Sequence, residues 1–297
     1  MRPSLLASRA RLVRAAVACA VLLALIGYVT AHLLTGGGGP PRCTVRADGE
    51  KVSLDPEQAV NAATIEAVAS SRALPERAVT IALATALQES GLRNLRRGDR
   101  DSLGLFQQRP SQGWGTARQV RDPVHAAGRF YADLVKVPGY SRLPLTVAAQ
   151  RVQRSGYPQA YAKHEAEAAV LTGALVGRDP AALTCPGPVD DGVRGDPARV
   201  RARLRHEFGP AVPAAAPARA PADQVVLPVA APARGWELAH WAVAHARELR
   251  IARVAYGGRV WRGQDADKGW RAARSAAPGV AAAAGSGGGA VTIETAH

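Results

Sequence analysis

The chain has 297 residues, with 38 Lys and Arg against 24 Asp and Glu, and a formal net charge of +14 at pH 7. A composition that is 47% hydrophobic and 21% charged excludes a wholly disordered or fibrous protein. The single long apolar run near the N-terminus excludes a polytopic membrane protein, and the length allows one or two domains.

The positive charge is spread along the chain. Residues 1–42 contribute +5, residues 43–185 contribute +4, residues 186–235 contribute +2 and residues 236–297 contribute +3. A nucleic-acid-binding protein normally carries a concentrated basic patch or stripe. We therefore expect no nucleic-acid partner and a protein that faces an anionic envelope.

The N-terminus has the pattern of a membrane-targeting signal. Four arginines, Arg2, Arg9, Arg11 and Arg14, precede an apolar stretch over residues 15–35. As a helix this stretch spans about 30 Å, enough to cross the hydrocarbon core of a lipid bilayer. Because positive charge stays on the cytoplasmic side, we expect the body outside the membrane. Cleavage at residues 29–31 would give a secreted protein instead. The continuing apolar run through residues 33–34 favours an uncleaved anchor, and a tether is expected at residues 36–41.

Cysteine usage agrees with an exported body. Cys43 and Cys185 are the two cysteines beyond the apolar run, and an oxidising exterior permits a disulfide between them. The alternative is two unrelated free thiols. A bridge would make residues 43–185 one domain whose ends meet.

Residues 43–185 have a helical pattern with no comparable strand. Apolar residues repeat at helical spacing, Asp-Pro and Pro-Glu pairs mark helix starts, and Gly91 marks a stop. The expected helices begin at Asp55-Pro56 and cover about residues 75–90, 124–134, 146–154 and 158–173.

Beyond residue 185 the pattern changes. A turn-rich stretch over residues 186–195 precedes a short basic helix from Asp196-Pro197 to about Phe208. The next predicted elements are an Ala/Pro linker (210–235), a helix (236–249), strands (251–256 and 291–295) and a disordered stretch (281–290). The expected fold is mainly α: a membrane helix, a helical domain at 43–185 and a small α/β segment at 236–297.

Glu89 is the leading candidate for chemistry. It occupies the last turn of an apolar helix, near the negative end of the helix dipole and partly buried. Both effects raise a carboxyl pKa and favour the protonated form that a general acid requires. The alternative is a solvated surface carboxylate at a helix end.

The segment Ser102–Gln108 is an apolar strip that ends in paired amides. Gln107 and Gln108 suit hydrogen bonding to a neutral glycan, or alternatively stabilise their own loop. Trp114 lies between two glycines and either stacks on a sugar ring or forms part of the core or cleft wall.

These two segments together resemble a known family. Glu89-Ser90 followed by Gly104-Leu105-Phe106-Gln107 resembles the Glu-Ser and Gly-Leu-Met-Gln motifs of soluble lytic transglycosylases and goose-type lysozymes. The string over residues 99–116 is similar to actinobacterial exported lysozyme-like proteins. Over roughly residues 50–180, the resemblance implies a lysozyme-like fold, a peptidoglycan substrate and Glu89 as the catalytic acid/base. It places Ser90 near that carboxylate, and Gly104 and Gln107 along the sugar-binding cleft.

The family's third motif, Ala-Tyr-Asn, has no counterpart at residues 148–153, where both the Tyr and the Asn are missing. Tyr157 or Tyr161 would have to take the place of that tyrosine. A glycosidase normally uses two carboxyl groups, whereas the resemblance implies that a transglycosylase uses one. Asp99 and Asp101 are the nearby candidates for a second carboxylate, unless they form surface ion pairs with the loop arginines.

The rest of the chain indicates no other chemistry. His240 and His245 lie about 140° apart on a helix and do not share a metal-ligand face, so we expect no metal and no cofactor. The C-terminal piece resembles the end portion of a cell-wall-hydrolase-associated module and is expected to be an accessory or docking segment. The alternatives to a peptidoglycan-cleaving enzyme are a glycan-binding module without turnover and a scaffold that recruits cell-wall or division proteins.

Overall fold

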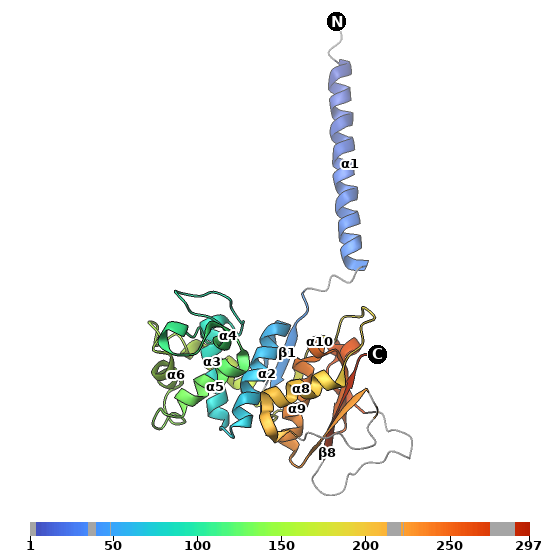
Figure 1. The fold of residues 1–297 in the computed structure, drawn as a ribbon. Coiled ribbons are helices and arrows are strands. Elements are labelled where there is room, and N and C mark those ends of the chain that lie inside the picture. The colour runs from blue at the N-terminus through green and yellow to red at the C-terminus, as the bar shows by residue number, and fades with distance from the viewer. Residues whose placement is uncertain (1–3, 35–39, 48, 213–220, 222, 274–288) are drawn as a thin grey trace. The chain divides into compact units, whose positions relative to one another are not determined.

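The computed structural model describes residues 4–34, 40–47, 49–212, 221, 223–273 and 289–297 (Figure 1). About half of the chain is helical, and two small antiparallel sheets accompany the helices. The chain divides into two compact units, residues 1–41 and residues 42–297.

The first unit is one long helix, α1 (Ser4–Leu34). Its stretch Val13–Thr30 is long enough and apolar enough to cross a membrane, a test that N-terminal signal sequences also pass. The choice between an anchor and a cleaved signal therefore stays open. Residues 36–39 of the predicted tether lie outside the described residues.

The helices of the second unit follow the predicted starts and stops closely. Asp55 and Asp196 are N-caps, each followed by a proline at the start of its helix. The helix expected from residue 158 begins only at Glu165, because the preceding residues form turns. The α-helices are α2 (Pro56–Ser71), α3 (Glu76–Ser90), α4 (Ala117–Val120), α5 (Pro123–Leu134), α6 (Leu145–Gln153), α7 (Glu165–Leu175), α8 (Pro197–Phe208), α9 (Pro232–Ala244) and α10 (Ala246–Leu249). Four 3-10 turns are η1 (Pro110–Gln112), η2 (Ala162–His164), η3 (Gly209–Ala211) and η4 (Gly263–Lys268).

A three-stranded sheet corrects the prediction that residues 43–185 contain no strand. Its order is β2-β1-β3, formed by β1 (Cys43–Ala47), β2 (Glu50–Leu54) and β3 (Leu183–Thr184). The side chains of β1 alternate between buried and more exposed positions. The strands are too short to stand out in the sequence, and β3 exists only through pairing with β1, about 140 residues earlier.

A five-stranded sheet in the C-terminal part has the order β4-β8-β5-β6-β7. Its strands are β4 (Gln224–Val229), β5 (Ile251–Tyr256), β6 (Arg259–Arg262), β7 (Arg271–Ala272) and β8 (Gly289–Thr295). The strands predicted at 251–256 and 291–295 are confirmed. The prediction of a poorly packed linker is wrong for residues 224–235, because β4 pairs with β8 and α9 begins at Pro232. Residues 213–220 and 222 of that linker, and residues 281–288 of the stretch expected to be disordered, lie outside the described residues.

The helical part and the C-terminal sheet share one hydrophobic core. The α2 helix contacts α3 and α5 on the one hand and α8 and α9 on the other (Figure 1). Ile65 of α2, Phe130 of α5, Trp241 of α9 and Ile293 of β8 all belong to this core. Residues on both sides of the predicted boundary at residue 185 are therefore packed together.

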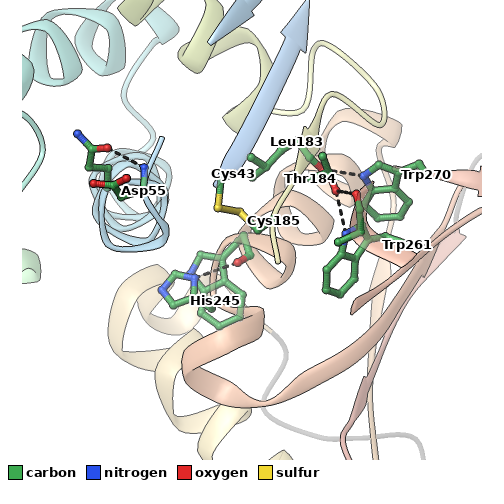
Figure 2. Close-up of a disulfide and its surroundings, with 11 residues drawn as sticks. Cys43, Asp55, Leu183, Thr184, Cys185, His245, Trp261 and Trp270 are labelled. Atoms are coloured by element: carbon green, nitrogen blue, oxygen red, sulfur yellow. Dashed lines mark hydrogen bonds between the residues drawn. A yellow bond between two sulfur atoms is a disulfide. The ribbon is translucent and has the colours of Figure 1, made fainter. Parts of the chain in front are cut away.

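The predicted disulfide between Cys43 and Cys185 is confirmed (Figure 2). Next to it, the indole of Trp270 donates a hydrogen bond of 2.8 Å to the carbonyl of Leu183. The indole of Trp261 donates one of 3.1 Å to the hydroxyl of Thr184. The bridge closes the ends of residues 43–185, and the two indoles attach that closure to the C-terminal sheet.

Candidate functional site

Glu89 lies in the last turn of α3, as predicted. The preceding residues of α3, from Ala78 to Leu87, are buried in the core and fix the helix in place. The helix ends because Gly91 adopts a left-handed conformation, with φ of 61°, and its N–H bonds back to the carbonyl of Leu87. Glu89 is therefore held at the rim of the core, half-buried.

Two side chains contact the Glu89 carboxylate. The hydroxyl of Tyr161 donates a hydrogen bond of 2.7 Å to Oε1 of Glu89, and Tyr161 is fully buried. The side-chain amide of Gln153, at the end of α6, lies near enough to the carboxylate to lower the pKa of Glu89. The same amide donates a 2.7 Å hydrogen bond to the carbonyl of Phe106. The site thus joins α3, the end of α6, the turn before η2 and the Gly104–Gln108 segment.

The electrostatics of the site favour a protonatable carboxyl. Burial raises the pKa of Glu89 above its ordinary value, and the hydrogen bonds from Tyr161 and Gln153 partly oppose this by stabilising the carboxylate. Burial, together with the facing carboxylate, raises the pKa of Tyr161, so the phenol keeps its proton and acts as a donor. A half-buried carboxyl in this state can donate a proton and then take one back.

Ser90 and Gly104 have structural roles in this site. The Ser90 hydroxyl donates hydrogen bonds to the carbonyls of Ala86 and Leu105, at 3.0 and 2.7 Å. The second of these bonds holds α3 against the Gly104–Gln107 segment. Gly104 has φ of 76°, and a Cβ there would lie 2.2 Å from the carbonyl oxygen of Val120. Both residues therefore hold the backbone around the site in place.

The paired amides also bond within the protein. The Gln107 side chain donates to the carbonyl of Gly104 at 3.2 Å, and the buried Gln108 donates to the carbonyl of Ala126 at 3.0 Å. These contacts match the loop-stabilising alternative for both residues. Their role as glycan ligands stays a prediction.

Of the remaining predicted site residues, only one contacts Glu89 directly. Tyr161 meets Glu89, whereas Tyr157 is 77% exposed and its backbone N–H bonds to the Ser155 hydroxyl. Trp114 is half-buried and lines a cleft of about 650 Å³ that also contains Gln153. Gln153 also lies near Glu89, so it connects the cleft with the neighbourhood of the carboxylate. The assignments of these residues to substrate binding remain predictions.

Neither candidate for a second carboxylate contacts Glu89. Asp101 accepts hydrogen bonds of 2.8 Å from Arg109 and from the backbone of Ser111, and the bond from Arg109 lowers the pKa of Asp101. Asp99 is exposed and pairs only with the neighbouring Arg100, at 3.9 Å, among the described residues. Among these residues, no cluster of three metal-ligating side chains occurs either.

Two groups of contacts were not predicted from the sequence. The first is the role of Gln153, which only its position in space reveals. The second is a buried polar cluster between α2, α8 and α9, where Glu207 accepts a 2.8 Å hydrogen bond from Trp241 and Arg234 donates a 2.6 Å hydrogen bond to Glu237. The available signal was Glu66, a charged residue within the apolar stripe of α2.

Comparison with known proteins concerns the other part of the chain. The family model described as VldE, C-terminal domain, matches residues 198–280, less than half of the chain. The match runs from α8 to beyond β7 and so includes β4 and α9. No curated protein matches the chain. The similarity therefore covers α8 to α10 and the strands β4 to β7, without β8, and it does not include Glu89 or the residues that contact it.

Proposed function

We propose that this protein is an enzyme that cleaves the glycan strand of peptidoglycan outside the membrane, with Glu89 as the general acid and base. The lysozyme-like fold implied by the motif resemblance is part of this proposal. The observation that carries it is the environment of Glu89: a half-buried carboxyl with a raised pKa that accepts a hydrogen bond from Tyr161. Burial of this kind prepares a carboxyl for general acid catalysis.

The proposed reaction uses one carboxyl. Protonated Glu89 donates its proton to the glycosidic oxygen, which leaves as a hydroxyl. The Glu89 carboxylate then accepts the proton of the sugar's own 6-hydroxyl as that oxygen bonds to the anomeric carbon. The product is a 1,6-anhydro ring, and no water is consumed. The Tyr161 hydroxyl stabilises the carboxylate between these two steps. The engagement of Asp101 by Arg109 and Ser111 supports this route over one that needs a second carboxylate.

Two features support an exported location. The α1 helix contains a segment able to cross a membrane. The Cys43–Cys185 bridge is typical of a protein that meets an oxidising compartment. We propose a membrane-attached protein with its body outside, or a secreted one if α1 is cleaved as a signal.

A second candidate function is glycan binding or scaffolding without turnover. The internal hydrogen bonds of Gln107 and Gln108 favour the scaffold, because these amides were expected to bind the glycan and instead bond to the carbonyls of Gly104 and Ala126. The extensive packing of the C-terminal sheet would then offer a stable surface for cell-wall or division proteins.

Purified peptidoglycan treated with the wild-type protein or with Glu89→Gln tests the proposal. We expect the wild type to release muropeptides with 1,6-anhydro ends, and Glu89→Gln to be at least about 100-fold slower while still pelleting with the wall. Glu167→Gln is the matched control, because burial also raises the pKa of Glu167, which lies on α7. It should keep full activity.

The other possible results distinguish a hydrolase, a binding module and a scaffold. Reducing ends would identify a hydrolase. Pelleting without any release by the wild type would overturn the enzyme and favour the binding module. Neither release nor pelleting would favour the scaffold.

A further inference from the structure

The cleft beside Glu89 has a strongly basic lining. Four cations line it, Arg129, Lys136, Arg151 and Arg154, against one carboxylate, Asp133. These five side chains sum to a net charge of +3. They come from α5, the turn that follows it and the end of α6.

The cleft has more cationic side chains than the protein's own carboxylates neutralise. Lys136 donates a 2.7 Å hydrogen bond to Asp133, and Arg129 lies 3.9 Å from the same carboxylate. Arg151 and Arg154 form no ion pair with any residue in the described part of the chain. The Nε atom of Arg129 is buried and has no hydrogen-bond partner. The charge available to a ligand therefore comes from Arg151 and Arg154, which are exposed and have no carboxylate partner among the described residues.

The cleft and the proposed reaction site share one residue, Gln153. Its side-chain amide lies near enough to the Glu89 carboxylate to lower the pKa of Glu89. The half-buried indole of Trp114 lies in the same lining. A ligand in the cleft would therefore meet an aromatic surface and several guanidinium groups close to the carboxyl proposed to react.

We propose that this cleft binds oxyanion substituents of the glycan, namely carboxylates of attached peptides or phosphates of attached polymers. Guanidinium groups match the planar geometry of carboxylate and phosphate and bind both through paired N–H donors. Arg151 and Arg154 supply the unpaired charge, and Trp114 packs against the sugar. This inference rests on the proposed function, because it takes the substrate to be a wall glycan.

Binding to purified cell walls tests the inference without cleavage. Full-length Glu89→Gln protein is pelleted with walls at increasing protein concentration, with and without the further change Arg151→Gln/Arg154→Gln. We expect the double change to weaken binding about tenfold and to reduce its dependence on salt, because two exposed charges are lost. Arg199→Gln/Arg205→Gln is the control, since both arginines are exposed on α8 without an ion pair among the described residues. It should bind like the parent. Arg151→Lys/Arg154→Lys keeps the charge but loses the paired N–H donors, so it should bind more tightly than the glutamine variant and more weakly than the parent.

Two treatments of the wall distinguish the source of the oxyanion. Carbodiimide amidation removes the carboxylates, and hydrogen fluoride removes phosphate polymers. If the parent and the double variant bind equally well after one treatment, the inference is supported, and the group that this treatment removes is the ligand. Persistence of the difference after both treatments overturns it. Equal binding by the double variant and the control overturns it, and so does failure of the parent to pellet. If the wild type cleaves nothing but the double variant still binds tenfold more weakly, the enzyme proposal fails and the oxyanion cleft stands.

Discussion

The hydroxyl of Tyr161 donates a 2.7 Å hydrogen bond to Oε1 of Glu89, although 72 residues separate the two in the chain. Tyr161 is fully buried in the turn before η2, and Glu89 lies in the last turn of α3. Because the pKa of Tyr161 is raised by burial and by the carboxylate it faces, the phenol is a fixed donor. One oxygen of Glu89 is therefore held in place, and the carboxyl gains a defined orientation.

Tyr161→Phe should shift the titration of Glu89. The hydrogen bond from Tyr161 lowers the pKa of Glu89, so its removal raises that pKa further. A general acid works in its protonated form, so the descending limb of the pH–rate profile should move to higher pH. The titration of isotope-labelled Glu89 by NMR reports the same shift independently of turnover. Tyr157→Phe, at the exposed tyrosine, should leave both measurements unchanged, and an unchanged titration in Tyr161→Phe would contradict the role assigned to the hydroxyl.

Removal of the disulfide should destabilise the second unit. The bridge closes a loop with a sequence separation of 142 residues, so Cys43→Ser/Cys185→Ser should lower the free energy of unfolding by about 3–5 kcal/mol. Denaturant unfolding of the full-length chain, followed by tryptophan fluorescence, measures this change. Cys19→Ser provides the control, because Cys19 is a free cysteine on α1. Coincident unfolding curves for the double variant and the control would exclude a stabilising role for the bridge.

Gly104→Ala should be more harmful than Gly113→Ala. Both glycines have positive φ, 76° and 80°, so both substitutions cost about 1 kcal/mol in backbone strain. Only at Gly104 would the new Cβ also collide, at 2.2 Å from the Val120 carbonyl oxygen. We expect an additional loss of about 1–3 kcal/mol in the free energy of unfolding and a displacement of the Gly104–Gln107 segment. Thermal unfolding of the two variants side by side measures the difference, and equal losses would show that the close contact has no energetic effect.

Glu66→Gln should flatten the dependence of stability on pH. Burial and the nearby Glu237 raise the pKa of Glu66 well above its ordinary value of 4.5. The folded protein therefore keeps a proton that the unfolded chain releases above pH 4.5, and stability falls as the pH rises from there towards the folded pKa. A neutral amide removes this linkage, so the variant should gain stability relative to the wild type with rising pH. Unfolding curves at several pH values test this, with the exposed Glu50→Gln keeping the wild-type slope. The same slope in Glu66→Gln would rule out proton uptake at Glu66.

Most helix ends of the second unit could be predicted because the signals are local. Asp55 and Asp196 cap helices that begin at the next residue, and Gly91 ends α3 by adopting a left-handed conformation. Helix caps depend on side chains within a few residues of the helix end. The strands were less accessible, because β3 forms only where Thr44 brings Thr184 into register.

The candidate site shows the same division. The sequence by itself determined that Glu89 ends a buried helix, and it reduced the tyrosine candidates to Tyr157 and Tyr161. Only the tertiary structure decided that Tyr161 meets Glu89, and that Gln153 joins Glu89 to a basic cleft. The physical reason is that hydrogen bonds and burial join residues far apart in the chain, whereas helical periodicity and capping act between near neighbours.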